Sequence, residues 1–66
     1  MSIVIDEFAK RARAARRAKE WSQLDLGRRL GHRSAQFVWK FENGVVDGDA
    51  DTRRKLAHAL GIQVPR

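Results

Sequence analysis

Few side chains in this 66-residue sequence have the types and spacing that chemistry requires. There is no cysteine, which excludes disulfides, thiolate metal sites and cysteine nucleophiles. His32 and His58 are too far apart in the chain to indicate a metal site. Asp47, Asp49 and Asp51 alternate as in a calcium loop, but no glutamate follows at the twelfth position, so we interpret them as turn and cap residues. With no nucleophile–base pair or phosphate-cradling glycine loop either, the sequence predicts a protein that is not an enzyme and needs no cofactor.

Basic side chains are abundant instead, and their distribution favours a polyanionic partner. The chain has 14 Lys and Arg against 8 Asp and Glu, a formal net charge of +6. Ten of those bases and two of those acids lie in residues 10–40. Such a footprint suits nucleic acid or an anionic membrane surface, and it also fits an ordinary solvated surface.

The chain reads as one small domain, residues 1–66, without a membrane-spanning segment. No apolar run approaches the ~20 residues needed to cross a bilayer. The first residues lack the basic and apolar regions of a signal peptide, so we expect a soluble cytoplasmic protein. Residues 3–5, Ile-Val-Ile, suggest a docking arm, a short strand or an extra plug for the core.

Four helices are expected to position the candidate side chains, over residues 6–19, 23–30, 35–42 and 50–60, in a compact all-α fold. Asp6 is a suitable N-cap for the first helix, and Ser22 with Asp25 forms a capping-box pattern for the second. Gly31 ends the second helix, and Ser34 is expected to cap the third. Either Asp49 or Asp51 caps the fourth, which Gly61 ends.

Two features of the second and third helices point to a specific arrangement. Gly27 in mid-helix costs roughly 1 kcal/mol against alanine, which a close backbone contact with a neighbouring helix would explain. In the third helix Phe37, Val38 and Phe41 share one face. The opposite face carries no acid, and consists of Ala35, Gln36, Trp39, Lys40 and Asn43. Two short helices joined by a tight turn, the second with a polar outer face, are typical of a helix-turn-helix.

The order and spacing of these residues resemble the Cro/C1-type (XRE family) helix-turn-helix domain of phage repressors. The resemblance covers residues 12–62, about three-quarters of the chain. It rests on Arg16, Trp21-Ser22-Gln23, Leu26-Gly27, Leu30-Gly31, Phe37-Val38, Phe41-Glu42-Asn43-Gly44, Leu56-Ala57 and Ala59-Leu60-Gly61-Ile62. It implies a lambda-repressor-like fold of four or five helices.

Structural roles also follow from the resemblance. It implies a salt bridge between Arg16 and Glu42, which would explain an arginine at the edge of an apolar helix face. It places Trp21 in the core. The chain departs from most members in a turn that is one residue longer between Gly31 and Glu42. It also ends before the usual fifth helix, so we expect that helix to be absent or replaced, which leaves the usual dimer surface undefined.

The same resemblance, with the geometry of a helix in the major groove, gives candidate DNA contacts. Gln36 suits adenine, Lys40 suits guanine, and the methyl of Ala35 suits thymine. Trp39 either stacks on a sugar or contacts a thymine methyl, or else packs against another subunit or the N-terminal arm. The family's phosphate contacts, together with nearby bases, imply a further set: Gln23, Arg28, Arg29, Arg33, Ser34 and Asn43. Gln36 and Lys40 are also compatible with ordinary solvated surface, the reading we prefer for Lys10 and Arg13.

The sequence therefore predicts a sequence-specific double-stranded DNA-binding regulator. The resemblance implies a homodimeric repressor that binds an inverted repeat and autoregulates a phage, plasmid or anti-defence operon. The alternative is an antitoxin-type module whose main partner is a protein and which binds DNA only secondarily. Its protein interface would then include Trp39, residues 3–5 or residues 45–46. A non-specific architectural or RNA-binding role for the arginine-rich first helix is a third possibility, against which the nearly neutral second half of the chain argues.

Overall fold

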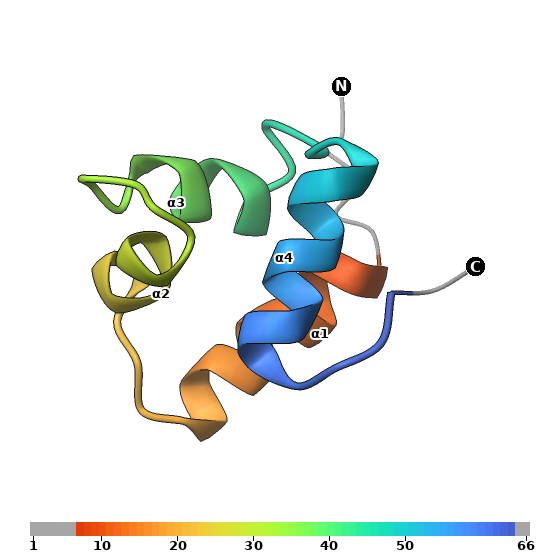
Figure 1. The fold of residues 1–66 in the computed structure, drawn as a ribbon, viewed down its shortest axis with the longest axis horizontal. Helices are drawn as coiled ribbons and strands as arrows, with labels where there is room; N and C mark the ends of the chain where they lie inside the picture. Colours follow the sequence, from red (N-terminus) through yellow and green to blue (C-terminus); the bar gives the residue numbers. More distant parts are fainter. Residues whose placement is uncertain (1–6, 65–66) are drawn as a thin grey trace.

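The computed structural model describes residues 7–64, which form four α-helices and no strand (Figure 1). The helices are α1 (Glu7–Ala18), α2 (Gln23–Arg29), α3 (Gln36–Glu42) and α4 (Ala50–Leu60). Helix α3 packs on α2 and α1, and α4 packs on α1. The all-α, four-helix prediction is confirmed. Asp6 and the Ile-Val-Ile segment lie outside the described residues. No helix in this range has the length and apolar content to cross a membrane.

The core fills the space between all four helices. Phe8 in α1 meets Phe41 in α3 edge to face, with ring centroids 5.9 Å apart. Leu26 of α2 and Leu56 of α4 are fully buried beside them. The remaining buried apolar residues are Ala9, Ala12, Val38, Ala57 and Leu60. Every helix therefore contributes to one core, and the short α2 and α3 depend on it, because isolated helices of this length are not stable in water.

Hydrogen-bonded caps fix where α2 and α4 begin, as predicted. The hydroxyl of Ser22 accepts from the Asp25 N–H at 3.0 Å, and the Asp25 carboxylate accepts from the Ser22 N–H at 2.8 Å. For α4, the Asp49 carboxylate accepts from the Thr52 N–H at 2.8 Å. Asp51, the other candidate cap, instead pairs with Arg54 and Lys55 on the helix surface.

Helix α3 begins one residue later than predicted, and Ser34 is not its N-cap. Ala35 occupies the N-cap position with helical dihedrals and makes no side-chain cap. The Ser34 hydroxyl lies one residue further back and accepts a long bond, 3.4 Å, from the Gln36 N–H. Serine favours both caps and turns, and here Ser34 belongs to the turn, one residue before the N-cap position.

Trp21 was expected in the core, and the structure places it against the core but only partly buried. The indole is half-buried at the edge of the core, beneath two cations. The Arg29 guanidinium carbon lies 4.0 Å from its ring centroid and the Lys19 ammonium 5.2 Å from it. Stacked cations cover the aromatic face while keeping their polar atoms in solvent, so Trp21 needs no deeper burial.

Gly27 makes a close backbone contact, as predicted, but with the turn before α3 rather than with a helix. A Cβ at Gly27 would lie 2.7 Å from the carbonyl oxygen of Ser34. The Gly27 carbonyl also accepts a 2.9 Å bond from the His32 N–H. The turn thus closes directly over α2, and only glycine leaves room for it.

We expect Gly27→Ala to destabilise the fold by about 1–3 kcal/mol, because the new methyl group overlaps a backbone oxygen that cannot rotate away. Helix propensity alone predicts the opposite sign, a gain of about 1 kcal/mol. Urea denaturation separates the two. Arg28→Ala, at the next, exposed position, is the control, and a more stable Gly27→Ala protein would contradict the steric argument.

The two carboxylate caps, Asp25 and Asp49, also make the free energy of unfolding depend on pH in the acid range. The Ser22 backbone N–H lowers the pKa of Asp25, and the Thr52 backbone N–H lowers the pKa of Asp49, from the ordinary value of 3.8. A carboxyl group with a lowered folded-state pKa stabilises fully above its unfolded pKa, and this contribution is lost as the pH falls through the folded value.

We therefore expect the Asp25→Asn and Asp49→Asn variants to show a shallower loss of unfolding free energy than the native chain as the pH falls from about 5 to about 2. Urea denaturation at several pH values measures this slope. Glu20→Gln, in the exposed turn after α1, is the matched carboxyl-to-amide control. Slopes equal to that control would show that the caps do not carry the acid sensitivity.

Candidate nucleic-acid interface

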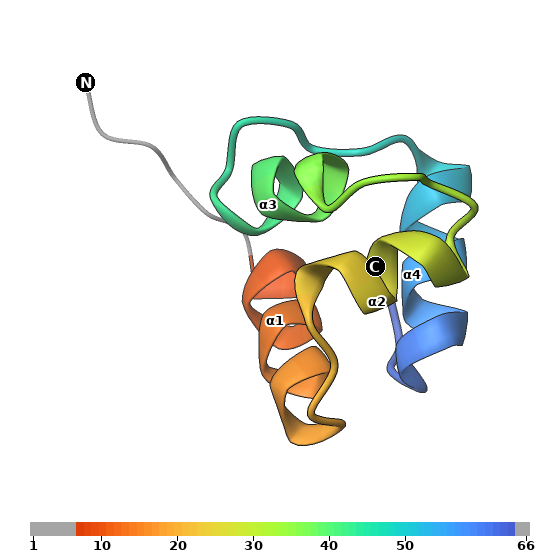
Figure 2. The ribbon, with the colours of Figure 1, turned by 90° about the vertical axis from the view of Figure 1, so that its left-hand side faces the viewer.

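Helices α2 and α3 pack closely together with the turn between them, and α3 packs on α1, which in turn packs on α4 (Figure 2). Gly31, which follows α2, has a left-handed φ of 88° and redirects the chain there. Val38 is buried against α2, and its side chain lies near Gly27. This pair of helices with its turn has the order and compactness of the helix-turn-helix that the sequence predicted.

A buried ion pair fixes the carboxyl end of α3 to α1. Arg16 Nε donates to Glu42 Oε2 at 2.7 Å and Arg16 Nη2 donates to Glu42 Oε1 at 3.0 Å, a bidentate arrangement. Both residues are buried, with 8% and 3% of their surfaces exposed. Arg16 Nη1 also donates to the Trp21 carbonyl at 2.8 Å. This is the pair that the family resemblance implied, and it explains the arginine on the apolar side of α1.

Gln23 extends this network to the start of α2. Its Nε2 donates to Glu42 Oε1 at 3.3 Å, and Arg13 Nε lies 3.9 Å from the same oxygen. Glu42 thus gathers side chains from α1 and α2 at the end of α3. Gln23 was predicted to contact phosphate. Its amide donates to Glu42 and so buttresses α3, while the phosphate contact stays a prediction. Arg13, expected as plain solvated surface, is half-exposed and close to this carboxylate.

The outer face of α3 presents polar and aromatic side chains to solvent. Gln36 is exposed, Lys40 is partly exposed, and 50% of the Trp39 surface is accessible. Ala35 is partly buried in the last position before the helix. All four predicted base contacts therefore lie on or next to α3. Trp39 and Lys40 follow Gln36 by three and four positions, which places the three side chains along one side of the helix.

The predicted phosphate contacts do not form one group. Arg28, Arg33 and Ser34 are exposed on α2 and the turn. Arg29 instead stacks on Trp21 and lines a groove between α2 and α4. Asn43 Nδ2 donates to the Trp39 carbonyl at 2.8 Å, which ends α3.

The aromatic support under the turn was not predicted. The rings of His32 and Phe37 stack with centroids 5.0 Å apart and planes 12° apart, and Phe37 stacks in turn on Phe41 at 6.1 Å. A row of rings therefore runs from the turn into the core. Helix periodicity gives no signal for it, because His32 lies outside any helix and its position depends on how the turn folds.

Arg53 is a second side chain whose role the sequence did not indicate. It belongs to α4 and reaches from there to the Phe8 ring, with its guanidinium carbon 4.9 Å from the ring centroid. Its Nη1 donates to the Asp47 carbonyl at 2.7 Å, which holds the loop before α4. The three alternating aspartates form no metal-binding group with other acids or histidines within residues 7–64.

Comparison with known proteins gives no identification by similarity: no family model, no curated protein and no solved structure matches this chain. The interface is therefore argued from its own geometry.

We expect Glu42→Gln to destabilise the protein by about 3–5 kcal/mol, because it leaves the buried Arg16 cation without a counter-charge. Replacing both members, as Arg16→Met with Glu42→Met, should recover part of that loss. Glu7→Gln is the control, since Glu7 pairs with Lys10 at 3.9 Å on the surface and such pairs contribute about 0–1 kcal/mol. Equal effects of Glu42→Gln and Glu7→Gln on thermal unfolding would contradict a structural role for the buried pair.

Proposed function

We propose that this protein is a sequence-specific double-stranded DNA-binding transcriptional regulator of the Cro/C1 helix-turn-helix type, in which α3 enters the major groove. The observation that carries the proposal is the charge of α3. Its one acid, Glu42, is buried in the pair with Arg16. What α3 offers to solvent is therefore free of carboxylate, a requirement for close approach to phosphates.

The exposed side chains of α3 match the chemistry of base edges. The Gln36 amide has the donor and acceptor that adenine N7 and N6 require, and Lys40 donates to guanine O6 or N7. Trp39 is large and apolar, and suits a thymine methyl or a sugar. We assign phosphate contacts to Arg28, Arg33 and Ser34, which flank α3 on α2 and the turn.

A homodimer on an inverted repeat is the form in which we expect the protein to act. One short α3 reaches few base pairs, and a second copy at a symmetric half-site adds contacts and specificity. The mechanism we propose is promoter occlusion in the cytoplasm, commonly of the protein's own operon. It requires no cofactor and no catalytic step.

One observation favours a second function, that of an antitoxin-type module that binds a protein. Trp39 and Val45 are large apolar residues with 50% and 52% of their surfaces exposed. Exposed apolar groups of this size are typical of interfaces. Under this alternative, alanine at Gln36 and Lys40 abolishes operator binding but spares the protein partner.

Selection from a randomised duplex library at ~150 mM salt tests the proposal, since this salt suppresses purely electrostatic binding. We expect enrichment of an inverted repeat. A single unpaired half-site would keep specific binding but reject the symmetric dimer, and no enrichment would favour the protein-binding alternative.

On the selected site, Gln36→Ala and Lys40→Ala should each cost about 1–3 kcal/mol of binding, roughly five- to 150-fold in Kd, and relax the preference at one base pair. Lys10→Ala, on the exposed side of α1, is the control and should leave that preference unchanged. Fluorescence anisotropy with native and substituted duplexes measures both quantities. Loss of affinity without any change in base preference would contradict base readout by α3.

A further inference from the structure

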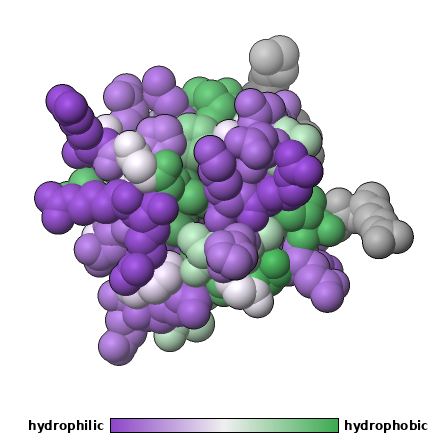
Figure 3. Space-filling model, in the orientation of Figure 1, coloured by the Kyte–Doolittle hydropathy of each residue, from purple (hydrophilic) through white to green (hydrophobic). Residues whose placement is uncertain are grey.

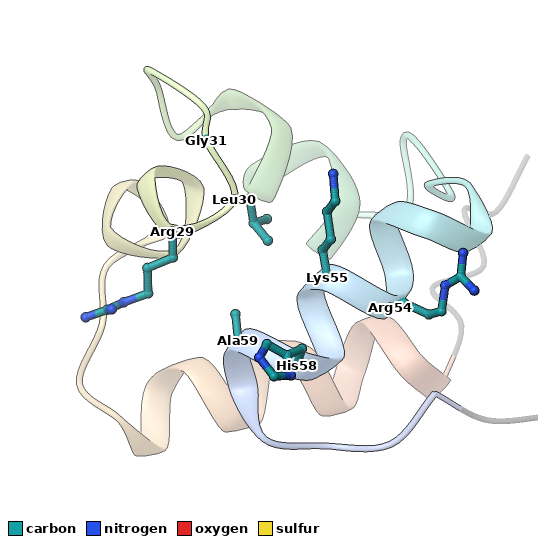
Figure 4. Close-up of a pocket in the computed structure, with 7 residues that line it drawn as sticks. All are labelled: Arg29, Leu30, Gly31, Arg54, Lys55, His58 and Ala59. Carbon is teal, nitrogen blue, oxygen red and sulfur yellow. The ribbon is translucent and has the colours of Figure 1, made fainter.

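A groove lies between the end of α2 and the outer side of α4. None of the residues that line it is among the DNA contacts proposed above. On this face hydrophilic side chains surround a hydrophobic centre (Figure 3). The groove has a volume of about 520 Å³ and is open to solvent. Leu30 and Gly31, which directly follow α2, line one side of it, and His58 and Ala59 line the other side from α4 (Figure 4).

The floor of the groove is apolar. The side chains of Leu30 and Ala59 point into it from opposite walls (Figure 4). Both are only partly buried, although both pack against the core. The floor is thus an exposed continuation of the core, and covering it with one apolar side chain removes that surface from water.

The rim of the groove is basic. The residues that line it include Arg29, Arg54, Lys55 and His58, and no acid. Asp51, which is not part of the lining, lies 3.6 Å from Arg54 Nη2 and 3.3 Å from Lys55 Nζ and neutralises part of this charge. The cations nevertheless outnumber the carboxylate.

Arg29 is fixed in place by its position over the Trp21 ring. A guanidinium stacked on an aromatic face keeps its N–H groups, which point outward in its plane, free for a carboxylate. Arg29 therefore loses little freedom on binding an anion, unlike a mobile surface lysine.

We propose that this groove binds an acidic segment of a partner protein, with one apolar side chain of the segment seated between Leu30 and Ala59. Carboxylates on either side of this anchor pair with Arg29 and Lys55. Charge complementarity identifies the occupant. A second copy placed groove to groove would bring the same cations together, and a free inorganic anion would leave the apolar floor uncovered. The site is independent of the proposed DNA contacts on α3.

The protein's own tryptophans allow a direct test. The chain has two, so Trp39→Phe leaves Trp21, under Arg29 at the rim, as the single fluorescent reporter. The probe is an acetylated and amidated nine-residue peptide of alternating Asp and Glu with a central leucine. We expect a saturable change in Trp21 emission at 150 mM salt. In the full-length native chain, amide shifts should concentrate at Leu30, Gly31 and Ala59.

Matched variants distinguish specific binding of the peptide in the groove from nonspecific electrostatic attraction to a basic protein. Lys55→Glu should weaken the peptide about tenfold more than Lys10→Glu, which makes the same charge change on α1. Arg29→Gln should weaken it as well, and replacement of the peptide's leucine by serine should weaken it about tenfold. Lys55→Glu should reduce affinity for the selected duplex no more than Lys10→Glu does, so failure here and failure of DNA binding are distinguishable.

The proposal is overturned if the titration does not saturate at 1 mM peptide, or if inorganic phosphate alone displaces the peptide. It is also overturned if Lys55→Glu and Lys10→Glu weaken the peptide equally, or if the leucine and serine peptides bind equally. Sedimentation is run alongside the titrations. Self-association that Lys55→Glu abolishes would assign the groove to a second copy instead.

Discussion

The pair between Arg16 and Glu42 is the interaction on which the arrangement of the other parts depends. It joins the last residue of α3 to α1, and through Gln23 and the Trp21 carbonyl it reaches the start of α2 and the loop before it. Two opposite charges buried together are costly unless their hydrogen bonds are satisfied. Here each guanidinium nitrogen has an acceptor, and no buried side-chain polar atom within residues 7–64 lacks a partner. The network therefore favours one orientation of α3 over others that a purely apolar contact would tolerate.

The same pair decides where charge is displayed. Because Glu42 is held inside, α3 presents no carboxylate to solvent, and the basic residues of α2 and the turn set the potential beside it. Three other acids have structural partners elsewhere: Asp25 and Asp49 bind backbone N–H groups at helix starts, and Asp51 lies among cations on α4. Structural contacts thus hold these acids away from the face that the proposal assigns to DNA, and the placement of charge says more than its net value.

Periodicity and capping chemistry predicted most of the fold, because four helices with apolar faces, two of them with good side-chain caps, leave few ways to pack. They also predicted the exposed side of α3. The errors lie where tertiary contacts decide. Ser34 lies one residue before the N-cap because the turn continues to Ala35, and the stacking of His32 on Phe37 depends on that turn. Trp21 is only partly buried and has Arg29 stacked on its ring, and the groove near it lies between the end of α2 and α4, which are distant in sequence. No single-helix pattern contains such information.

The two ends of α3 are held very differently. At its carboxyl end Glu42 is fixed by a bidentate pair and Asn43 closes the last turn, whereas at its amino end Ala35 offers no cap and the Ser34 contact is long. Local opening of a helix begins where its backbone groups are least satisfied. We therefore expect the first turn of α3, at Gln36, to open more readily than its last turn beside α1. If α3 enters the major groove as proposed, adjustment of that first turn would accommodate a DNA surface of imperfect shape without changing the direction of the helix axis.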